Sequence, residues 1–274
     1  MNYDEYYLLC REEYLKANPS TDQNSLRNFY EETVSVRNTK SLPPEYETTV
    51  NEISLKIKED FDNMTDCDDD GLMIKHNNIW KFSKEIKLLC NILAPSLERD
   101  KYSCHVYVDK IYIYRTATPK PDSSYLWHYD NNPHEIVKTL IYLTDVTEEN
   151  SPFEYLQKQG APGQGFLGLC TRKGTKTCYK PPNGSRVGSQ VNALLQHGYE
   201  KNKVCGPKGT AISFLNNTYH RVNVLERGYR DVINIRVKPT LIPAPEYANE
   251  KWTTSFEHSG VVNMDPEKAW KSVV

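Results

Sequence analysis

Two side chains that can bind a metal stand two residues apart in the stretch Trp127–Asp130, namely His128 and Asp130. If this stretch is an extended strand, alternate side chains point to the same face, so one imidazole nitrogen and one carboxylate oxygen converge on a single point. A third donor has to come from a distant part of the chain. The best candidate is His220, which follows a glycine, a predicted strand and an Asn-Asn turn.

Two histidines and one carboxylate on one face of a metal, with the other positions open, are typical of non-haem Fe(II) oxygenase sites. On its own the His-x-Asp pattern is weak, because His128 can be an ordinary strand histidine and Asp130 can begin the turn at residues 131–133. His134 follows Pro133, and this turn is predicted to direct it away from the metal and towards substrate. The remaining histidines have no partner pattern and are predicted to be structural or exposed: His76, His105, His197 and His258.

The composition excludes several classes of protein. The 274 residues include 34 basic and 36 acidic side chains, a balance that favours neither nucleic acid nor an anionic membrane as partner. The seven cysteines are scattered without a Cys-x-x-Cys pair, which favours free thiols in a reducing compartment. The chain starts without the pattern of a signal peptide, and no apolar run approaches the ~18 residues of a membrane helix. We therefore expect a cytoplasmic protein.

The first 102 residues are mostly helical in pattern. Apolar residues recur at helical spacing and are interrupted by proline-containing breakers at residues 18–20 and 41–44. These helices are expected to cover the outside of a sheet. They are predicted near residues 6–15, 25–30, 46–61 and 79–94.

The pattern changes to strands from residue 103. Short runs rich in β-branched and aromatic residues predict strands near 104–108, 110–115, 139–144, 210–214 and 231–237. Many short strands with a helical cover indicate a mainly β fold with a jelly-roll core. We predict one domain over residues 1–274, with helical cover at 1–102, the core at 103–240 and a tail at 241–274.

Two further segments have alternative interpretations. Residues 157–203 are rich in glycine, lysine and polar residues and are predicted to be a long loop, which is usually functional or mobile. Its basic residues are expected to be solvated rather than to attract an anionic substrate: Arg172, Lys173, Lys176 and Lys180. The stretch Asp66–Gly71 matches the start of a calcium-binding loop, but Asn77 stands where a bidentate glutamate is needed. A solvated acidic turn is the favoured interpretation there.

The order of several segments resembles the phytanoyl-CoA dioxygenase branch of the Fe(II)/2-oxoglutarate-dependent oxygenases. The matching segments are Trp127–Asp130, Leu143–Asp145, Gly209–Phe214, His220–Arg221 and Arg230–Val232. The resemblance implies a double-stranded β-helix core in which His128, Asp130 and His220 hold Fe(II). It also implies 2-oxoglutarate and O₂ as cosubstrates.

By this resemblance, Arg230 binds the far carboxylate of 2-oxoglutarate, a role that suits the planar two-donor guanidinium group. Arg236 is the alternative anchor, because residues 230, 232, 234 and 236 share one strand face, and Arg227 is expected in the preceding turn. Many relatives place Ser or Thr two residues after the anchor, where this chain has Val232. The hydroxyl groups that can replace it are those of Thr139, Tyr112 and Tyr114.

The resemblance further implies hydroxylation of a substrate with release of succinate and CO₂, because Asp130 stands where related halogenases have a small residue. We expect a small-molecule or a carrier- or sugar-linked substrate and a monomer or homodimer. Arg221, beside His220, is expected either to face substrate or to pair with an acid. Two alternatives remain: a jelly-roll binding module with a structural metal or vestigial histidines, and a cupin-type dioxygenase that does not use 2-oxoglutarate.

Overall fold

The computed structural model describes residues 3–20, 29–67, 72–74, 76–118, 123–130, 135–168 and 187–243. The helices are α1 (Tyr3–Ala17), α3 (Pro44–Asp62), α4 (Ser83–Ser96) and α5 (Gly188–Leu195), with short helical turns at Thr39–Ser41, His76–Phe82, Leu97–Tyr102 and Ser123–Tyr125. The strands are β1 (Val34–Arg37), β2 (Val106–Thr116), β3 (Val137–Tyr142), β4 (Phe153–Lys158), β5 (Tyr199–Val204), β6 (Ala211–Leu215), β7 (His220–Val222) and β8 (Arg230–Pro239).

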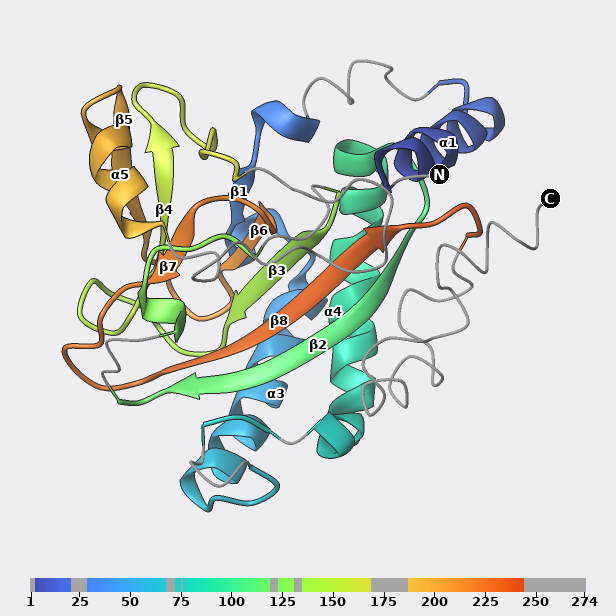
Figure 1. The fold of residues 1–274 in the computed structure, drawn as a ribbon. Coiled ribbons are helices and arrows are strands. Elements are labelled where there is room, and N and C mark those ends of the chain that lie inside the picture. Colours follow the sequence, from blue (N-terminus) through green and yellow to red (C-terminus); the bar gives the residue numbers. More distant parts are fainter. Residues whose placement is uncertain are drawn as a thin grey trace.

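Two antiparallel sheets form the centre of the molecule (Figure 1). The larger sheet has the strand order β1-β6-β3-β8-β2, and the smaller sheet has the order β5-β4-β7. An isolated bridge between His128 and His220 adds the segment before residue 130 to the edge of the smaller sheet at β7. From β5 to β8 the chain passes from one sheet to the other with each successive strand, as it does from β3 to β4. Two antiparallel sheets connected in this way form the predicted double-stranded β-helix.

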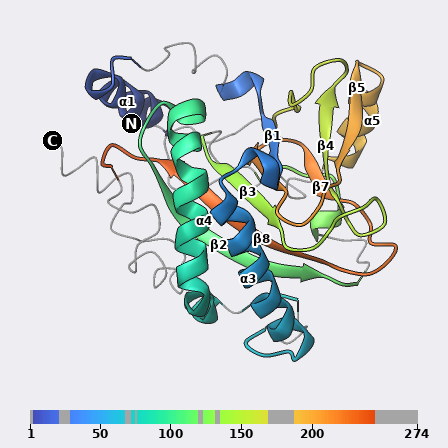
Figure 2. The same ribbon diagram turned by 180° about the vertical axis from the view of Figure 1, so that it is seen from behind.

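The helices cover the outer face of the larger sheet, as predicted. Figure 2 shows α3 and α4 lying across this face. The buried residues of α3 follow a helical stripe that includes Tyr46, Val50 and Ile57, and they belong to the same core cluster as Ile141 of β3 and Ile233 of β8. Apolar periodicity in the first hundred residues therefore produces helices whose buried stripe completes the core of the sheet.

The opposite face of the larger sheet points towards the smaller sheet. Its side chains include Tyr142 and Val232, which share a second core cluster with Phe153 and Tyr155 of β4. Because successive side chains of a strand alternate between faces, β3 and β8 contribute to both cores. The residues of β3 and β8 that belong to the candidate site described below lie on this inner face.

Several elements differ from the sequence prediction. The two strands expected between 104 and 115 form one strand, β2, with a bulge between Val108 and Lys110. Strands β1, β4, β5 and β7 and helix α5 were not predicted. Strand β5, Tyr199–Val204, and helix α5 lie inside the segment that was predicted to be a loop. The strand is rich in Lys, Glu and Asn and exposes much of its surface, so it lacks the apolar alternation that marks a strand in sequence.

Some predictions concern residues outside the described ranges. They include most of the proposed helix at 25–30, His134, His258, the basic residues at 172–180 and the tail beyond residue 243. The calcium-loop match lies mostly outside them as well, but Asp66 at its start forms an ion pair with Lys81 at 2.8 Å.

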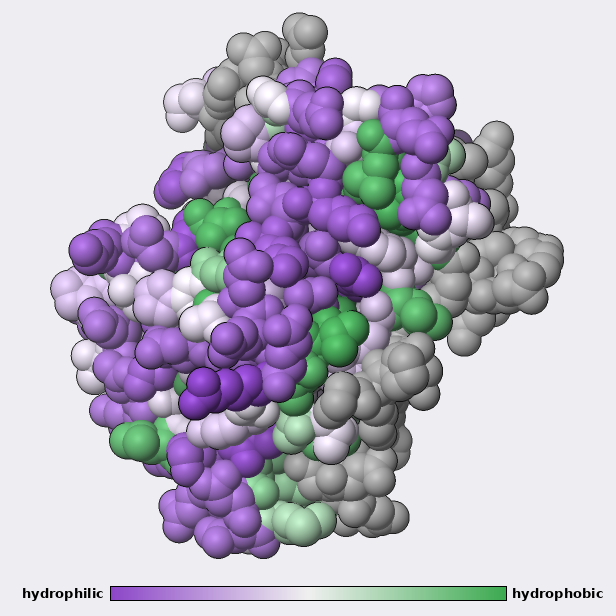
Figure 3. Space-filling view, turned by 90° about the vertical axis from the view of Figure 1, so that its left-hand side faces the viewer, coloured by the Kyte–Doolittle hydropathy of each residue, from purple (hydrophilic) through white to green (hydrophobic). Residues whose placement is uncertain are grey.

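Polar residues dominate the side of the molecule that carries β5 and α5, where apolar residues form separate patches (Figure 3). Such a distribution is typical of a surface in contact with water. Among the described residues, no helix combines the length and the apolar character needed to cross a bilayer.

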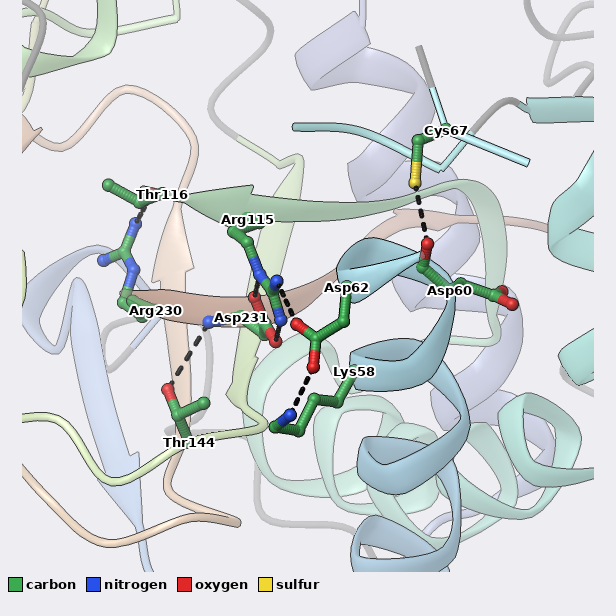
Figure 4. Close-up of polar contacts among 9 residues, drawn as sticks. All are labelled: Lys58, Asp60, Asp62, Cys67, Arg115, Thr116, Thr144, Arg230 and Asp231. Carbon is green, nitrogen blue, oxygen red and sulfur yellow. Dashed lines mark hydrogen bonds and ion pairs between the residues drawn. The ribbon is translucent and has the colours of Figure 1, made fainter. Parts of the chain in front are cut away.

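An ionic network fixes the end of the β2–β8 pair against α3 (Figure 4). Arg115 donates to both carboxylate oxygens of Asp231, at 2.7 and 2.8 Å, and to Asp62 at 2.8 Å. Asp62 also pairs with Lys58 of α3. The side chains of Arg115 and Asp231 are only 9% and 2% exposed. The network therefore holds Asp231, and with it the neighbouring Arg230, at a defined position.

We predict that Arg115→Met lowers the free energy of unfolding by about 3–5 kcal/mol, because Asp231 would remain as a buried carboxylate without its cation. Urea denaturation of the metal-free protein measures this difference. Lys203→Met is the control, since it removes a pair with Glu148 whose side chain is 75% exposed, and it should cost at most about 1 kcal/mol. Equal effects of the two substitutions would contradict a special role for the Arg115 network.

Candidate metal centre

His128 and His220 face each other as a hydrogen-bonded pair between antiparallel segments. The backbone N–H of His128 donates to the His220 carbonyl at 3.0 Å, and the N–H of His220 donates to the His128 carbonyl at 2.9 Å. Residues paired in this way project their side chains from the same face. Their ring centroids consequently lie 4.3 Å apart, although 91 residues of chain stand between them in the sequence.

Backbone carbonyls orient both imidazoles. Nδ1 of His128 lies 2.8 Å from the Leu126 carbonyl oxygen, and Nδ1 of His220 lies 2.7 Å from that of Thr218. A carbonyl oxygen can only accept, so we assign the proton of each ring to Nδ1. Nε2 of each ring then carries the lone pair that a metal requires, with the orientation that second hydrogen bonds commonly impose on ligating histidines.

Asp130 completes a group of donors. One ligand atom from each of His128, Asp130 and His220 lies within 4.8 Å of the others. In the described part of the chain this is the one group of three or more His, Cys, Asp or Glu side chains that can hold a metal ion. The structure therefore brings together the three residues that the sequence singled out as metal ligands.

The charge of Asp130 is stabilised by its surroundings. Burial on its own would raise the pKa of Asp130, but Lys138 and the two imidazoles together hold that pKa well below its usual value. Lys138 of β3 donates to Oδ2 of Asp130 at 2.6 Å. This contact was not predicted, although a lysine inside a strand of otherwise apolar residues was a visible signal.

The side chains of His128, Asp130 and His220 line a cavity of about 420 Å³ between the two sheets. Phe153 and Phe214 also line it, with ring centroids 5.5 and 4.9 Å from that of His220. These rings surround the histidine with apolar surface. Tyr112 and Tyr114, predicted as cosubstrate-binding residues, line the same cavity.

Arg230 is fully buried at the first position of β8. Its Nη1 donates to the Ser151 carbonyl at 2.5 Å, and its Nη2 lies 3.4 Å from the Thr116 hydroxyl (Figure 4). Nε has no hydrogen-bond partner, and neither has the buried hydroxyl of Ser151. No carboxylate of the described residues forms an ion pair with Arg230. A buried guanidinium group without an anion is costly, so this end of the molecule is prepared for a negative charge.

Tyr114 and Thr116 connect Arg230 to the cavity. Thr116 is the register partner of Arg230 on β2, and both Tyr114 and Thr116 line the cavity. Burial raises the pKa of Tyr114, Arg230 lowers it and Asp130 raises it. The charges of Arg230 and Asp130 therefore act on the Tyr114 hydroxyl in opposite directions.

The other predicted residues lie elsewhere. Thr139 points to the helix side of β3, where its hydroxyl bonds to that of Ser213 at 2.8 Å, so the structure does not bring it to the cavity. Arg236, the alternative anchor, is already held by both oxygens of Asp109. Arg227 is exposed. Arg221 pairs with buried Glu154, which is the second of its two predicted roles.

Two histidines behave as predicted for residues outside the site. Nδ1 of His105 lies 3.2 Å from Glu98, and its ring contacts Tyr14 edge-on. His197 is exposed beyond the end of α5. Both are thus structural or surface residues.

Comparison with known proteins shows the fold to which this geometry belongs. No family model and no curated protein matches the sequence. Among solved structures, EctD from S. alaskensis with bound Fe has a TM-score of 0.56 and 14% identity, over 88% of this chain and 85% of that chain. EctD with 2-oxoglutarate and 5-hydroxyectoine has a TM-score of 0.55 and 15% identity, over 84% and 80%.

The carbocyclase SnoK from nogalamycin biosynthesis, described as non-heme and α-ketoglutarate-dependent, has a TM-score of 0.54 and 16% identity, over 83% of this chain and 89% of that chain. This chain has their fold. At such low identity the likeness extends to the double-stranded β-helix and its helical cover, and the function has to be argued from the site itself.

We predict that His220→Ala weakens Co(II) binding to the metal-free protein at least about 100-fold, because a direct ligand contributes more than the 10- to 100-fold typical of its supporting contacts. Isothermal titration calorimetry measures the affinity. His197→Ala should bind Co(II) like the wild type. Circular dichroism spectra should be unchanged in both variants, and retained affinity in His220→Ala would refute the ligand assignment.

Proposed function

We propose that this protein is a non-haem Fe(II)- and 2-oxoglutarate-dependent oxygenase. The proposal depends on one observation: two histidines and one carboxylate line a cavity that is also lined by Thr116, and Thr116 contacts Arg230, a buried arginine without an ion pair among the described residues. The two histidines and the carboxylate suit Fe(II), and the buried arginine suits a carboxylate of 2-oxoglutarate. Together they are difficult to explain by a structural role alone.

His128, Asp130 and His220 would hold the metal through two neutral nitrogens and one carboxylate oxygen. When bound, Fe(II) supplies the redox chemistry that reduces O₂, with 2-oxoglutarate as the source of electrons. The chain itself contributes ligand orientation, through the two backbone carbonyls that fix the imidazoles. It also restricts water, through the apolar rings of Phe153 and Phe214 beside His220.

Arg230 would bind the distal carboxylate of 2-oxoglutarate. Its Nε and the Ser151 hydroxyl are buried without partners, and both are groups that a carboxylate can accept from. Tyr114 and Thr116 offer hydroxyl groups from β2 in place of the Ser or Thr that Val232 replaces. Tyr112 lies farther along the same strand and lines the cavity as well, which suits a contact with either 2-oxoglutarate or substrate.

The two alternatives do not explain Arg230. A metal-binding module or a cupin-type dioxygenase without 2-oxoglutarate needs no cation at this end of the cavity, and Arg230 would then be an ordinary ion-pair residue. Among the described residues Arg230 instead has no carboxylate partner, whereas Arg115, Arg221 and Arg236 each hold one.

We infer that the substrate is a small molecule that undergoes hydroxylation. In support, EctD was solved with the small molecule 5-hydroxyectoine, and SnoK belongs to the biosynthesis of nogalamycin. The cavity of about 420 Å³ falls within the range of small-molecule sites. We further propose that the protein belongs to the phytanoyl-CoA dioxygenase-like branch, on the basis of the matching sequence segments. We also propose that it forms a single domain, because the helices and the larger sheet share one core cluster.

The first test is anaerobic addition of Fe(II) and 2-oxoglutarate to the metal-free protein, followed by visible spectroscopy. We predict a weak charge-transfer band that requires both additions. Arg230→Ala should weaken 2-oxoglutarate binding at least about 100-fold, because it removes two charge-assisted hydrogen bonds of roughly 1.5–3 kcal/mol each. Arg227→Ala, which removes an exposed arginine from the preceding loop, is the matched control and should titrate like the wild type.

Other outcomes of this titration separate the alternatives. Tight metal binding without a band would favour a dioxygenase that does not use 2-oxoglutarate. Failure to bind any divalent metal would leave a binding module. Succinate formation under air, dependent on Fe(II) and abolished in Arg230→Ala, would independently support the proposal.

A further inference from the structure

Lys138 contacts a metal ligand directly. Its Nζ lies 2.6 Å from Oδ2 of Asp130, and the two side chains are 17% and 22% exposed. Lys138 belongs to the inner face of β3, as does Leu140, and both line the cavity. The neighbouring Thr139 points to the helix side. The lysine head therefore lies inside the cavity and is directed at the carboxylate.

This contact leaves the two oxygens of Asp130 in different situations. Oδ2 accepts a charge-assisted hydrogen bond, which is stronger than a neutral one, whereas Oδ1 is available to the metal. A carboxylate can bind a metal through one oxygen or through two. If Asp130 bound a six-coordinate ion through both oxygens instead of one, the three residues would occupy one more coordination position. One position fewer would then remain for 2-oxoglutarate and O₂.

We propose that Lys138 is a positioning residue that restricts Asp130 to coordination through one oxygen, and so preserves the position that O₂ requires beside a chelated keto acid. The inference depends on the proposed function. It adds a residue that the two-histidine-one-carboxylate pattern does not contain.

Lys138 also changes the charge around the metal. Two neutral imidazoles and one carboxylate contribute a single negative charge, and the ammonium group of Lys138 cancels it. A bound divalent ion would then keep its full charge in a cavity that is partly lined by apolar side chains, where attraction to an anionic cosubstrate is stronger than in bulk water. The lysine thus favours binding of the dianion 2-oxoglutarate, at some cost to metal affinity.

The chain contains a matched control for this charge. In the register of the larger sheet, Arg236 pairs with Lys138 on one side and with Lys110 on the other. Lys110 is half-buried and close enough to Lys138 for the two charges to influence each other, since Lys138 contributes to lowering its pKa. In the structure Lys110 makes no hydrogen bond or ion pair with Asp130. Lys110→Met therefore removes a nearby positive charge and leaves the contact with Asp130 intact.

The experiment combines crystal structures with titrations. In the Mn(II) form of the wild type, we expect one Asp130 oxygen on the metal and the other on Lys138. In Lys138→Met we expect both oxygens on the metal. The affinity for 2-oxoglutarate, measured from the charge-transfer band, should fall about 10- to 100-fold. Metal binding should not weaken. Lys110→Met should change the 2-oxoglutarate affinity less than about threefold, by screened charge alone, and Lys138→Arg should restore most of it.

Distinct results would overturn the inference or the proposed function. If the hydrogen bond between Lys138 and Asp130 is broken in the Mn(II) form of the wild type, the positioning role is refuted. This outcome needs no variant, so the proposal can be tested even if Lys138→Met does not fold. Unchanged coordination with weakened 2-oxoglutarate binding in Lys138→Met would make the lysine a direct cosubstrate contact instead. Absence of a metal and 2-oxoglutarate complex in the wild type would refute the proposed function itself.

Discussion

The reciprocal backbone hydrogen bonds between His128 and His220 are the constraint on which the site depends. They place two side chains on one face at the edge of the smaller sheet, and the period of two then brings Asp130 to the same face as His128. A slip of one residue in this pairing would turn His220 away from its partner. The backbone thus determines the geometry of the donors before any metal is bound, and the carbonyls of Leu126 and Thr218 determine which nitrogen each ring presents.

The distribution of buried charge distinguishes Arg230 from three neighbouring arginines. Arg115, Arg221 and Arg236 hold Asp231, Glu154 and Asp109, carboxylates that are between 2% and 5% exposed. A buried pair of this kind satisfies both partners and leaves no binding capacity. Arg230 is buried as deeply as these carboxylates. Its guanidinium group, however, contacts the Ser151 carbonyl and the Thr116 hydroxyl instead of an acid. A fully buried guanidinium group that meets no carboxylate among the described residues has the arrangement expected of an anion-binding group.

Sequence reasoning predicted the general fold correctly, because runs of apolar and β-branched residues and the order of the strands are visible in the sequence. It also named His128, Asp130 and His220, which the structure brings together, whereas Arg230 was predicted from the family resemblance. It missed β5 because an exposed strand of lysine, glutamate and asparagine has no apolar alternation. It also named Thr139 as a site residue and gave Lys138 no role. Residues 137–142 are largely buried on both faces of the strand. In such a strand the sequence does not reveal which set of alternate residues points inwards, so only the three-dimensional pairing distinguishes the two.

The position of Val232 shows how a neighbouring strand can present the hydroxyl group that β8 lacks at this position. Val232 lies on the inner face of β8, where it packs in the apolar cluster with Tyr142 and Phe153 and cannot donate a hydrogen bond. Across the β2–β8 register, however, Val232 faces Tyr114 and Arg230 faces Thr116. Residues opposite each other on one face are close enough to share a ligand. The β2 strand therefore presents hydroxyl groups opposite the positions of β8 that carry Val232 and Arg230, and the register that Arg115 and Asp231 secure keeps Thr116 beside the guanidinium group.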